Sequence, residues 1–495
     1  MTNAPPFEQA KKPSNDPHFL QIVAKPRQTA KVKAEPKLTR VAFKVSRLME
    51  FCSERELQNQ TGHSVYDWPL VVGKEGMDNA LDACEEAEVA PDITIIVSSG
   101  TIIVEDNAAG IDTETIDSIL DYSIRVSSRE AYVSPTRGAQ GNALKTILAM
   151  SFVLNRKINS DADAAGITVI ETRGIKHQIE FRVDHINNQP KIIHTMTESL
   201  VTVGTKLTIN WPPETDDLLH YAANRFKSLI EAYVWFNPHL TLRGVWFGRE
   251  FINVKATNPT WVKWQPRNPT SPHWYDESRL QRYLAAHVAR DRDHAQHRTV
   301  REFIAEFRGL SGSAVQRRIL ADVGCSHQSL AQFFGIDQVN RAGIAKLLVA
   351  MRDCSKPVDP KHLGVIGIEH LKQRFLAEGG NIDTFQYQPR KGMTGDGIPY
   401  VIEFAFGLHQ SGLSKDGAAF SRKFITGANW SAGINNPFRA FGSTGEGLEN
   451  TLAKVRANAG QPVICALHLA SAYIQYADRG KSSIILTDNA EQPND

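Results

Sequence analysis

A helical stretch with three polar side chains on one face constrains this sequence more than any other feature. Apolar residues recur at helical spacing from Trp68 to Cys84, which predicts a helix there. Glu75 and Asn79 are four residues apart and Asp82 lies seven beyond Glu75, so all three share one face. Burying such a face is costly unless it has ligands, and the alternative is a solvated polar face. A glutamate that takes a proton from water, with an asparagine oxygen on Mg²⁺ one turn away, suits a site that hydrolyses a phosphate.

A β-hairpin is predicted directly after this helix. The runs Asp92–Ser98 and Thr101–Asp106 are rich in β-branched residues and flank a turn at Ser99–Gly100. At the end of the second run, the Asp106 carboxylate can accept a hydrogen bond from an exocyclic amine, and Gly110 permits close backbone approach. The alternative is an ordinary turn, because Asp-Asn followed by Gly is common there.

A glycine-bearing loop forms the third motif. It leads directly into an apolar helix predicted over Leu144–Leu154. Backbone N–H groups at such a helix start can bind phosphate, although the same pattern also occurs in plain connections. The candidate loop residues are Gly138, Ala139, Gln140, Gly141 and Asn142.

The order of predicted elements indicates an α+β fold, with a sheet covered by helices on one face. Residues 258–290, which carry four prolines and three tryptophans, are predicted to be an irregular connection. Further strands are predicted at 166–172, 177–183, 204–210, 399–407 and 462–470. Further helices are predicted at 300–307, 314–323 and 344–351.

Composition sets broad limits on function. The chain has 495 residues and a formal net charge of +2, so any nucleic-acid contact must come from local patches. Its five cysteines are scattered and no apolar run could span a bilayer, which predicts a cytoplasmic protein, nucleoid-associated in a prokaryote. Residues 1–38 are basic, and we expect either a solvated, disordered arm or a segment that contacts DNA or a second protomer.

Together, the motifs resemble those of the GHKL ATPases, the gyrase, histidine-kinase and MutL superfamily. The order of Glu-x-x-x-Asn, Asp-Asn-x-x-Gly and Gly-x-x-Gly is the order of that family, and Gly204-Thr205 is similar to its late Gly-Thr box. Other stretches resemble the B subunits of type IIB topoisomerases (topoisomerase VI). These stretches are Ser46–Phe51, Pro272–Trp274, Arg301–Gly324, Leu363–Glu369 and His468–Ile484. The resemblance covers residues 40–485, with diverged stretches between the motifs.

The resemblance implies an organisation and a set of roles. The expected regions are a basic tail over 1–38, a GHKL (Bergerat) ATPase domain over 39–257, a linker with a helix–two-turns–helix domain over 258–356, and a transducer domain over 357–495. Glu75 would be the general base, Asn79 would hold Mg²⁺, and Lys481 would reach the γ-phosphate. The other nucleotide-binding residues would be Asp82, Asp106, Gly110, Ile111, Gly138, Ala139, Gln140, Gly141, Asn142 and Thr205.

The function implied by the resemblance is that of an ATP-hydrolysing subunit that forms a homodimer on ATP and clamps or passes DNA. A separate A-type subunit would cleave the DNA, but the chain continues only to Asp495 after Lys481, where the family usually has a long docking helix. One alternative is therefore a GHKL switch of the MutL or chaperone kind that clamps DNA or a protein partner. Ala108 and Ala143 replace usual family glycines, so another alternative is a scaffold that binds no nucleotide.

Overall fold

The computed structural model divides the chain into two units, Met1–Lys44 and Val45–Asp495, and all of the residues described here belong to the second. The described residues are 52–120, 131–137, 143–158, 164–184, 189–265, 267–293, 296–335, 338–412, 420–439, 447–454, 457–458 and 460–485. The predicted arm over 1–38 and the Ser46–Phe51 motif lie outside them. Within the described part of the chain, no helix is long and apolar enough to cross a membrane.

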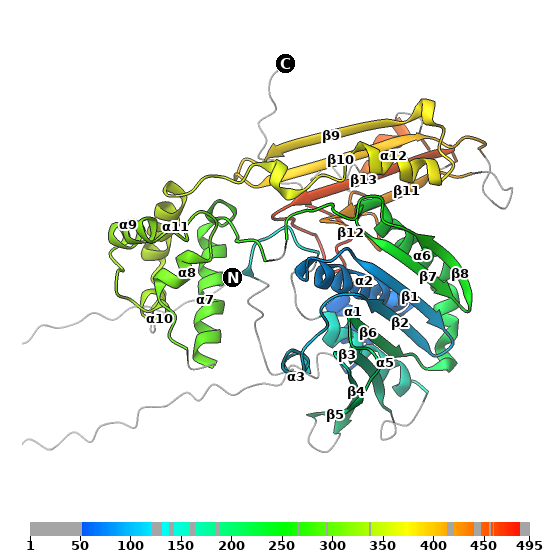
Figure 1. The fold of residues 1–495 in the computed structure, drawn as a ribbon, viewed down its shortest axis with the longest axis horizontal. Coiled ribbons are helices and arrows are strands. Elements are labelled where there is room, and N and C mark those ends of the chain that lie inside the picture. Colours follow the sequence, from blue (N-terminus) through cyan, green and yellow to red (C-terminus); the bar gives the residue numbers. More distant parts are fainter. Residues whose placement is uncertain are drawn as a thin grey trace, which may run out of the picture. The chain divides into compact units, whose positions relative to one another are not determined.

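The first half of the chain builds an eight-stranded mixed sheet, in the order β5-β4-β3-β6-β2-β1-β7-β8 (Figure 1). β1 pairs antiparallel with β2 and parallel with β7. Its alternate residues Ile93, Ile95 and Val97 are fully buried, which is the period-two pattern of a strand with one covered face. The strands are β1 Asp92–Ser98, β2 Thr101–Asp106, β3 Gly166–Thr172, β4 Ile175–Asp184, β5 Gln189–Glu198, β6 Thr205–Asn210, β7 Thr241–Trp246 and β8 Arg249–Val254.

Helices cover this sheet in one layer. α2 (Trp68–Glu86) packs along β2 and contacts both α5 (Ala143–Arg156) and α6 (Asp216–Phe236). Gly76 permits the close approach of α2 to the sheet, because a Cβ there would lie 2.8 Å from Val104 Cγ2. The smaller helices α1 (Glu54–Thr61) and α3 (Thr113–Leu120) pack against α5.

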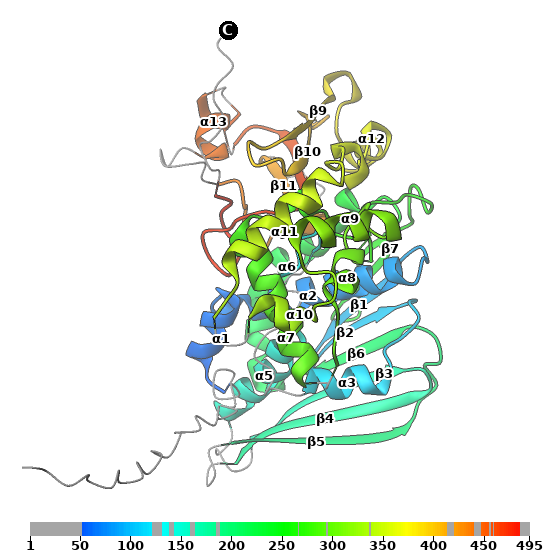
Figure 2. The ribbon, with the colours of Figure 1, turned by 90° about the vertical axis from the view of Figure 1, so that its left-hand side faces the viewer.

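The middle of the chain is helical and has its own apolar cluster, in which Trp274, Tyr283, Phe303 and Leu347 are buried. Figure 2 looks onto these helices, which are α7 Glu277–Asp293, α8 Val300–Ala305, α9 Ser313–Val323, α10 Leu330–Phe334 and α11 Arg341–Asp353. The prediction of an irregular connection over 258–290 is wrong for its second half, because α7 begins at Glu277. The four prolines all precede α7, and Leu280 and Leu284 within α7 recur at helical spacing.

The C-terminal part forms a second sheet in the order β12-β11-β13-β10-β9. Its strands are β9 Gln386–Met393, β10 Pro399–Leu408, β11 Lys423–Ala428, β12 Ser431–Ala432 and β13 Val463–Ser471. α6 contacts β11 and β12 as well as the first sheet, so one continuous core links the two sheets. The remaining elements are α12 Ile368–Ala377, α13 Leu448–Lys454 and the short 3₁₀ turns Val65–Asp67, Pro213–Thr215, Pro272–Trp274, Pro360–Leu363 and Ile382–Thr384.

The α+β class is confirmed, as are the predicted strands and helices at their core positions. The domain boundaries at 38, 257 and 356 stay predictions.

Candidate functional site

The end of β2 lies beside the start of β6. Asp106 is the register partner of Thr205, and its Oδ1 accepts hydrogen bonds from the backbone N–H of Ala108 (2.9 Å) and of Thr205 (3.2 Å). Burial raises the pKa of the Asp106 carboxyl above its ordinary value, although these two hydrogen bonds oppose the shift. Both bonds go to one oxygen, and none of the described residues donates to Oδ2. The structure therefore brings two predicted residues together and leaves one carboxylate oxygen available as an acceptor.

A tight backbone turn follows Asp106. Gly110 has φ +77°, and a Cβ built there would lie 2.5 Å from Thr172 Oγ1. That hydroxyl accepts a hydrogen bond from the Ile111 N–H and donates one to the Gly204 carbonyl, both at 3.0 Å. Only glycine fits at position 110, so Gly110 and Ile111 are held against the same strand ends as Asp106.

The neighbouring Asn107 has a structural role. Its Oδ1 accepts from the Asp92 backbone N–H (2.9 Å) and from Cys84 Sγ (3.2 Å), which ties the end of β2 to α2. Ala108 is buried and is not among the residues with positive φ, so its Cβ causes no backbone strain. Ala143 is the first residue of α5. The backbone at Ala108 therefore gives no support to the idea of a site impaired by the loss of glycine.

The polar face of α2 is placed as the spacing predicts. Asn79 is exposed, and the side chains of Glu75 and Asp82 are each 25% exposed. Asp82 differs from the other two because its Oδ1 lies 2.6 Å from Arg137 Nη1. Glu75 and Asn79 thus present their polar groups away from the core, whereas the Asp82 carboxylate is engaged in an ion pair.

Sequence reasoning missed the neighbouring Asp78, which is buried on α2. Its Oδ2 lies 2.5 Å from Lys74 Nζ and accepts from the Ser431 hydroxyl at 2.8 Å, while Oδ1 accepts from the Tyr233 hydroxyl at 2.7 Å. Burial alone would raise the pKa of Asp78, but the charge of Lys74 holds it below its ordinary value. Lys74 Nζ is also 3.9 Å from Glu75 Oε1. The four-residue spacing of Lys74 and Asp78 is the one local sign of this pair.

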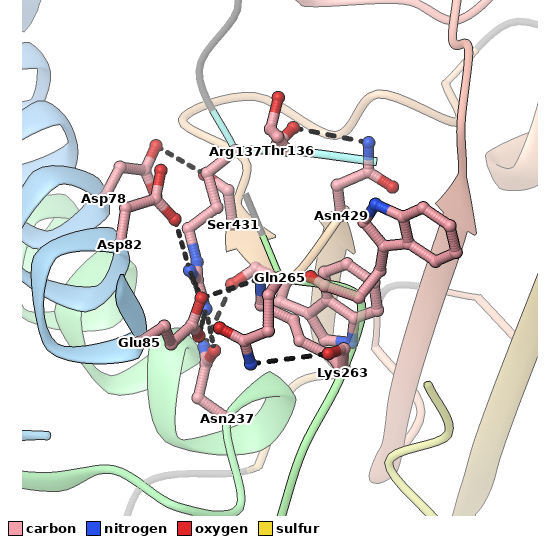
Figure 3. Close-up of polar contacts among 12 residues, drawn as sticks. Asp78, Asp82, Glu85, Thr136, Arg137, Asn237, Lys263, Gln265, Asn429 and Ser431 are labelled. Carbon is pink, nitrogen blue, oxygen red and sulfur yellow. Dashed lines mark hydrogen bonds and ion pairs between the residues drawn. The ribbon is translucent and has the colours of Figure 1, made fainter. Parts of the chain in front are cut away.

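A buried ionic centre adjoins this face (Figure 3). Glu85 accepts from Arg137 at 2.6 and 2.8 Å and from Lys263 at 2.7 Å, and it lies 3.1 Å from His239 Nε2. Burial would raise the pKa of Glu85, but Arg137 and Lys263 hold it well below its usual value. Arg137 also donates to Asn237 Oδ1 at 2.7 Å. With Asp82 as the second carboxylate, the two cations and two carboxylates are matched, so this centre fixes Arg137 without leaving an uncompensated ion.

Lys481, the lysine expected to reach the γ-phosphate, comes from a loop far along the chain. Lys481 has φ +53° and its Nζ donates to the Arg137 carbonyl oxygen at 3.1 Å. Burial, followed by the charge of Lys74, lowers the pKa of Lys481, and Glu75 is the first of the nearby acids that oppose the shift. Arg479 anchors the same loop by donating to the Asn59 carbonyl. The structure thus brings Lys481 to the residue that directly precedes Gly138.

Several predicted residues cannot be placed. Gly138, Ala139, Gln140, Gly141 and Asn142 lie outside the described residues. Among the described residues, no cluster of three or more His, Cys, Asp or Glu side chains could hold a metal ion. Asn79 therefore stays a predicted magnesium ligand of the kind that would act together with phosphate oxygens and water.

Comparisons with known proteins bear on the whole chain. No family model matches it. The B subunit of type 2 DNA topoisomerase 6 from Archaeoglobus fulgidus is 26% identical over 455 residues, and that from Methanococcoides burtonii is 24% identical over 442 residues. These alignments cover 84% and 83% of this chain, which spans 66% and 64% of the two relatives, slightly under two thirds.

Among solved structures, the 43K ATPase domain of Thermus thermophilus gyrase B in complex with an aminocoumarin matches 89% of this chain and 85% of its own. Its identity is 11% and its TM-score is 0.36, a likeness too low to define the fold. The sequence relatives carry the assignment instead, because they match over more than four fifths of the chain. The expected resemblance is confirmed: over most of its length the chain is similar to the B subunits of type 2 DNA topoisomerase 6.

Proposed function

We propose that this chain is the ATP-binding and ATP-hydrolysing subunit of a type IIB topoisomerase-like complex. The observation that supports the proposal is the contact between the Lys481 loop and Arg137, the residue that forms an ion pair with Asp82 of α2. Asp106 lies at the end of β2, and none of the described residues donates a hydrogen bond to its Oδ2. Glu75 lies on the exposed side of α2, and Lys481 reaches Arg137 from the C-terminal region. An acceptor, a base and a cation are the groups that binding and cleaving a nucleoside triphosphate requires.

Each group has a proposed task. Asp106 would bind the adenine amine through Oδ2, with Gly110, Ile111 and Thr205 forming the adjoining backbone. Glu75 would accept a proton from the attacking water. Lys481 would stabilise charge on the γ-phosphate, and bound Mg²⁺, with Asn79 as one ligand, would neutralise phosphate charge.

The charged side chains next to Glu75 support this proposal. Lys74 Nζ lies 3.9 Å from Glu75 Oε1 but only 2.5 Å from Asp78 Oδ2, so Lys74 forms its close ion pair with Asp78. Glu75 can therefore act as a base while a fixed cation stays close to it. Asp82 would contribute indirectly by holding Arg137.

We further propose that ATP drives homodimerisation and that the dimer clamps or passes DNA, with an A-type subunit for cleavage. The support is the name of the relatives, which are topoisomerase 6 B subunits. The alternative, a MutL-like or chaperone-like switch, predicts the same ATP chemistry without strand passage.

Two measurements test this proposal. Light scattering on the full chain should give a doubled mass when a non-hydrolysable ATP analogue is added, and a constant mass would contradict ATP-driven dimerisation. ATP-dependent relaxation of supercoiled DNA should appear when an A-type subunit is supplied. ATP-dependent dimers without relaxation in the presence of any A-type subunit would favour the alternative switch.

A further inference from the structure

The tip of the β11–β12 hairpin has an unusual backbone conformation. Ala428 pairs with Ser431, so Asn429 and Trp430 form the two-residue turn between the strands. Their φ angles are +49° and +62°. Two-residue hairpins of this kind favour Asn followed by Gly, because both central residues need positive φ. Asn429 suits its place, but a tryptophan at Trp430 is strained. Strain of this kind persists only where surrounding contacts enforce it, and it points to a functional constraint.

The first tip residue holds the segment that leads to Gly138. Asn429 Nδ2 donates to the Thr136 carbonyl at 3.4 Å (Figure 3). Asn429 Oδ1 accepts from the Ser471 backbone N–H at 2.9 Å. The next carbonyl, that of Arg137, accepts from Lys481. Two consecutive carbonyls of the 136–137 segment are therefore held by side chains from the C-terminal third of the chain.

The contacts of Trp430, the second residue of the turn, explain why its strained backbone persists. The Trp430 indole is fully buried, and Lys263 Nζ lies 4.7 Å from its ring centroid. The backbone N–H of Trp430 donates to His468 Nε2 at 3.0 Å, and its backbone carbonyl accepts from Asn237 Nδ2 at 2.9 Å. Burial, with the charges of Arg137 and Lys263, lowers the pKa of His468 to about 3, so the imidazole stays a neutral acceptor. Glycine at Trp430 would remove the strain but also the ring that packs on the ionic centre.

Ser431, the residue directly after the turn, contacts α2. The Ser431 hydroxyl donates to Asp78 Oδ2 at 2.8 Å, the same oxygen that binds Lys74. Asp78 directly precedes Asn79 and lies three residues after Glu75. The hairpin thus contacts both α2 and the 136–137 segment.

We propose that the strained turn Asn429–Trp430, together with Ser431, is a positioning device for the candidate site. It fixes the Thr136–Arg137 backbone and Asp78 relative to Glu75, so it sets the rate of catalysis and leaves nucleotide affinity nearly unchanged. The kinetic part rests on the proposed function, whereas the positional part rests on the hairpin contacts alone.

The test uses two variants of the full chain and one control. Asn429→Gly tolerates positive φ and removes both side-chain bonds, and Ser431→Ala removes the bond to Asp78. The control is Asn258→Gly at an exposed loop residue. Without nucleotide, hydrogen exchange of residues 131–137 should accelerate in Asn429→Gly and not in the control. With ATP, each variant should lower kcat about two- to ten-fold, because each loses one hydrogen bond to the 136–137 segment or to Asp78, and should change the affinity for a non-hydrolysable analogue less than about two-fold.

The two arms separate the possible failures. Unchanged exchange over 131–137 in Asn429→Gly would overturn the positional role. Parental kcat in both hairpin variants, or nucleotide affinity lost in parallel with thermal stability, would overturn the kinetic role. If the parent protein binds no ATP, the proposed function fails, while the exchange measurement still decides the positional claim. If Asn429→Gly does not fold, Ser431→Ala carries the test through kcat and through exchange along α2.

Discussion

Two acidic side chains on α2, Asp78 and Asp82, have long-range partners that the sequence pattern does not predict. The spacing predicts that Asp82 shares a helix face with Glu75, and the family resemblance implies that it binds nucleotide; its side chain is partly exposed and paired with Arg137. Asp78, which no pattern singles out, is the more deeply buried and binds three side chains. Spacing along a helix predicts which face a residue occupies, but it does not predict the distant partners Tyr233 and Ser431.

Glu75→Ala should abolish most ATP turnover while ATP still binds, because it removes the proposed base and leaves the other contacts intact. Loss of a general base lowers the rate about 100- to 10,000-fold. The control is Glu86→Ala, a change at an exposed residue of the same helix. Steady-state hydrolysis measures both, and parental turnover in Glu75→Ala would remove Glu75 from its role.

The affinity for ATP should depend on pH through Asp106. Burial raises the pKa of this carboxyl, so it becomes protonated at a higher pH than an ordinary aspartate as the pH falls. A protonated Asp106 loses an acceptor for the adenine amine, so affinity should decline toward acidic pH. Asp106→Asn should bind about ten- to a hundred-fold more weakly, as expected when a charged hydrogen bond is lost, and this acidic decline should disappear. Equal titration curves for the two proteins would show that Asp106 is only a turn residue.

At the scale of elements, local patterns are sufficient for the parts that shape the site. α2, the β1–β2 hairpin and α5 follow from clear helical or alternating periodicity. The strands β5, β7, β8, β9, β11 and β12 are not predicted. Of these, β5 and β9 are edge strands with largely exposed, polar residues, so they lack an alternating apolar pattern. The loop with Lys481 has no periodic pattern, and only the resemblance to a family points to it. The strained hairpin tip is missed because positive φ at Trp430 results from tertiary contacts.

Lys481 should contribute more to ATP turnover than to ATP binding. Lys481→Ala should lower ATP turnover on the order of 100-fold, the usual effect of removing one positioned group that stabilises transition-state charge. Binding should weaken only modestly, because backbone N–H groups would still hold the phosphates. Lys481→Arg should rescue little, since the guanidinium is planar and bulkier and would not keep the bond to the Arg137 carbonyl.

The matched control for this prediction is Lys356→Ala, which removes an exposed lysine elsewhere. Single-turnover hydrolysis and analogue binding should be measured together for all three variants. Parental hydrolysis in Lys481→Ala would contradict the switch role and leave only the contacts of the first sheet to support an ATP site.

At the scale of the whole molecule, long-range contacts make the buried ionic centre. Arg137 and Lys263 both bind Glu85 of α2, and Lys263 Nζ lies over the ring of Trp430 from the second sheet, although these residues are far apart in the sequence. No spacing rule predicts this buried centre, because each charge is acceptable only when the others are present. The candidate nucleotide site and the second sheet are therefore in physical contact through a few side chains.

The central claim is that these segments form an ATP site, and nucleotide titration tests it most directly. Isothermal titration of the full chain with a non-hydrolysable ATP analogue and Mg²⁺ should give saturable binding of one nucleotide per chain. Binding should be retained in Glu75→Ala and weakened in Asp106→Asn. An absence of saturable binding to the parent chain at millimolar analogue, or equal affinity in all three proteins, would contradict the account.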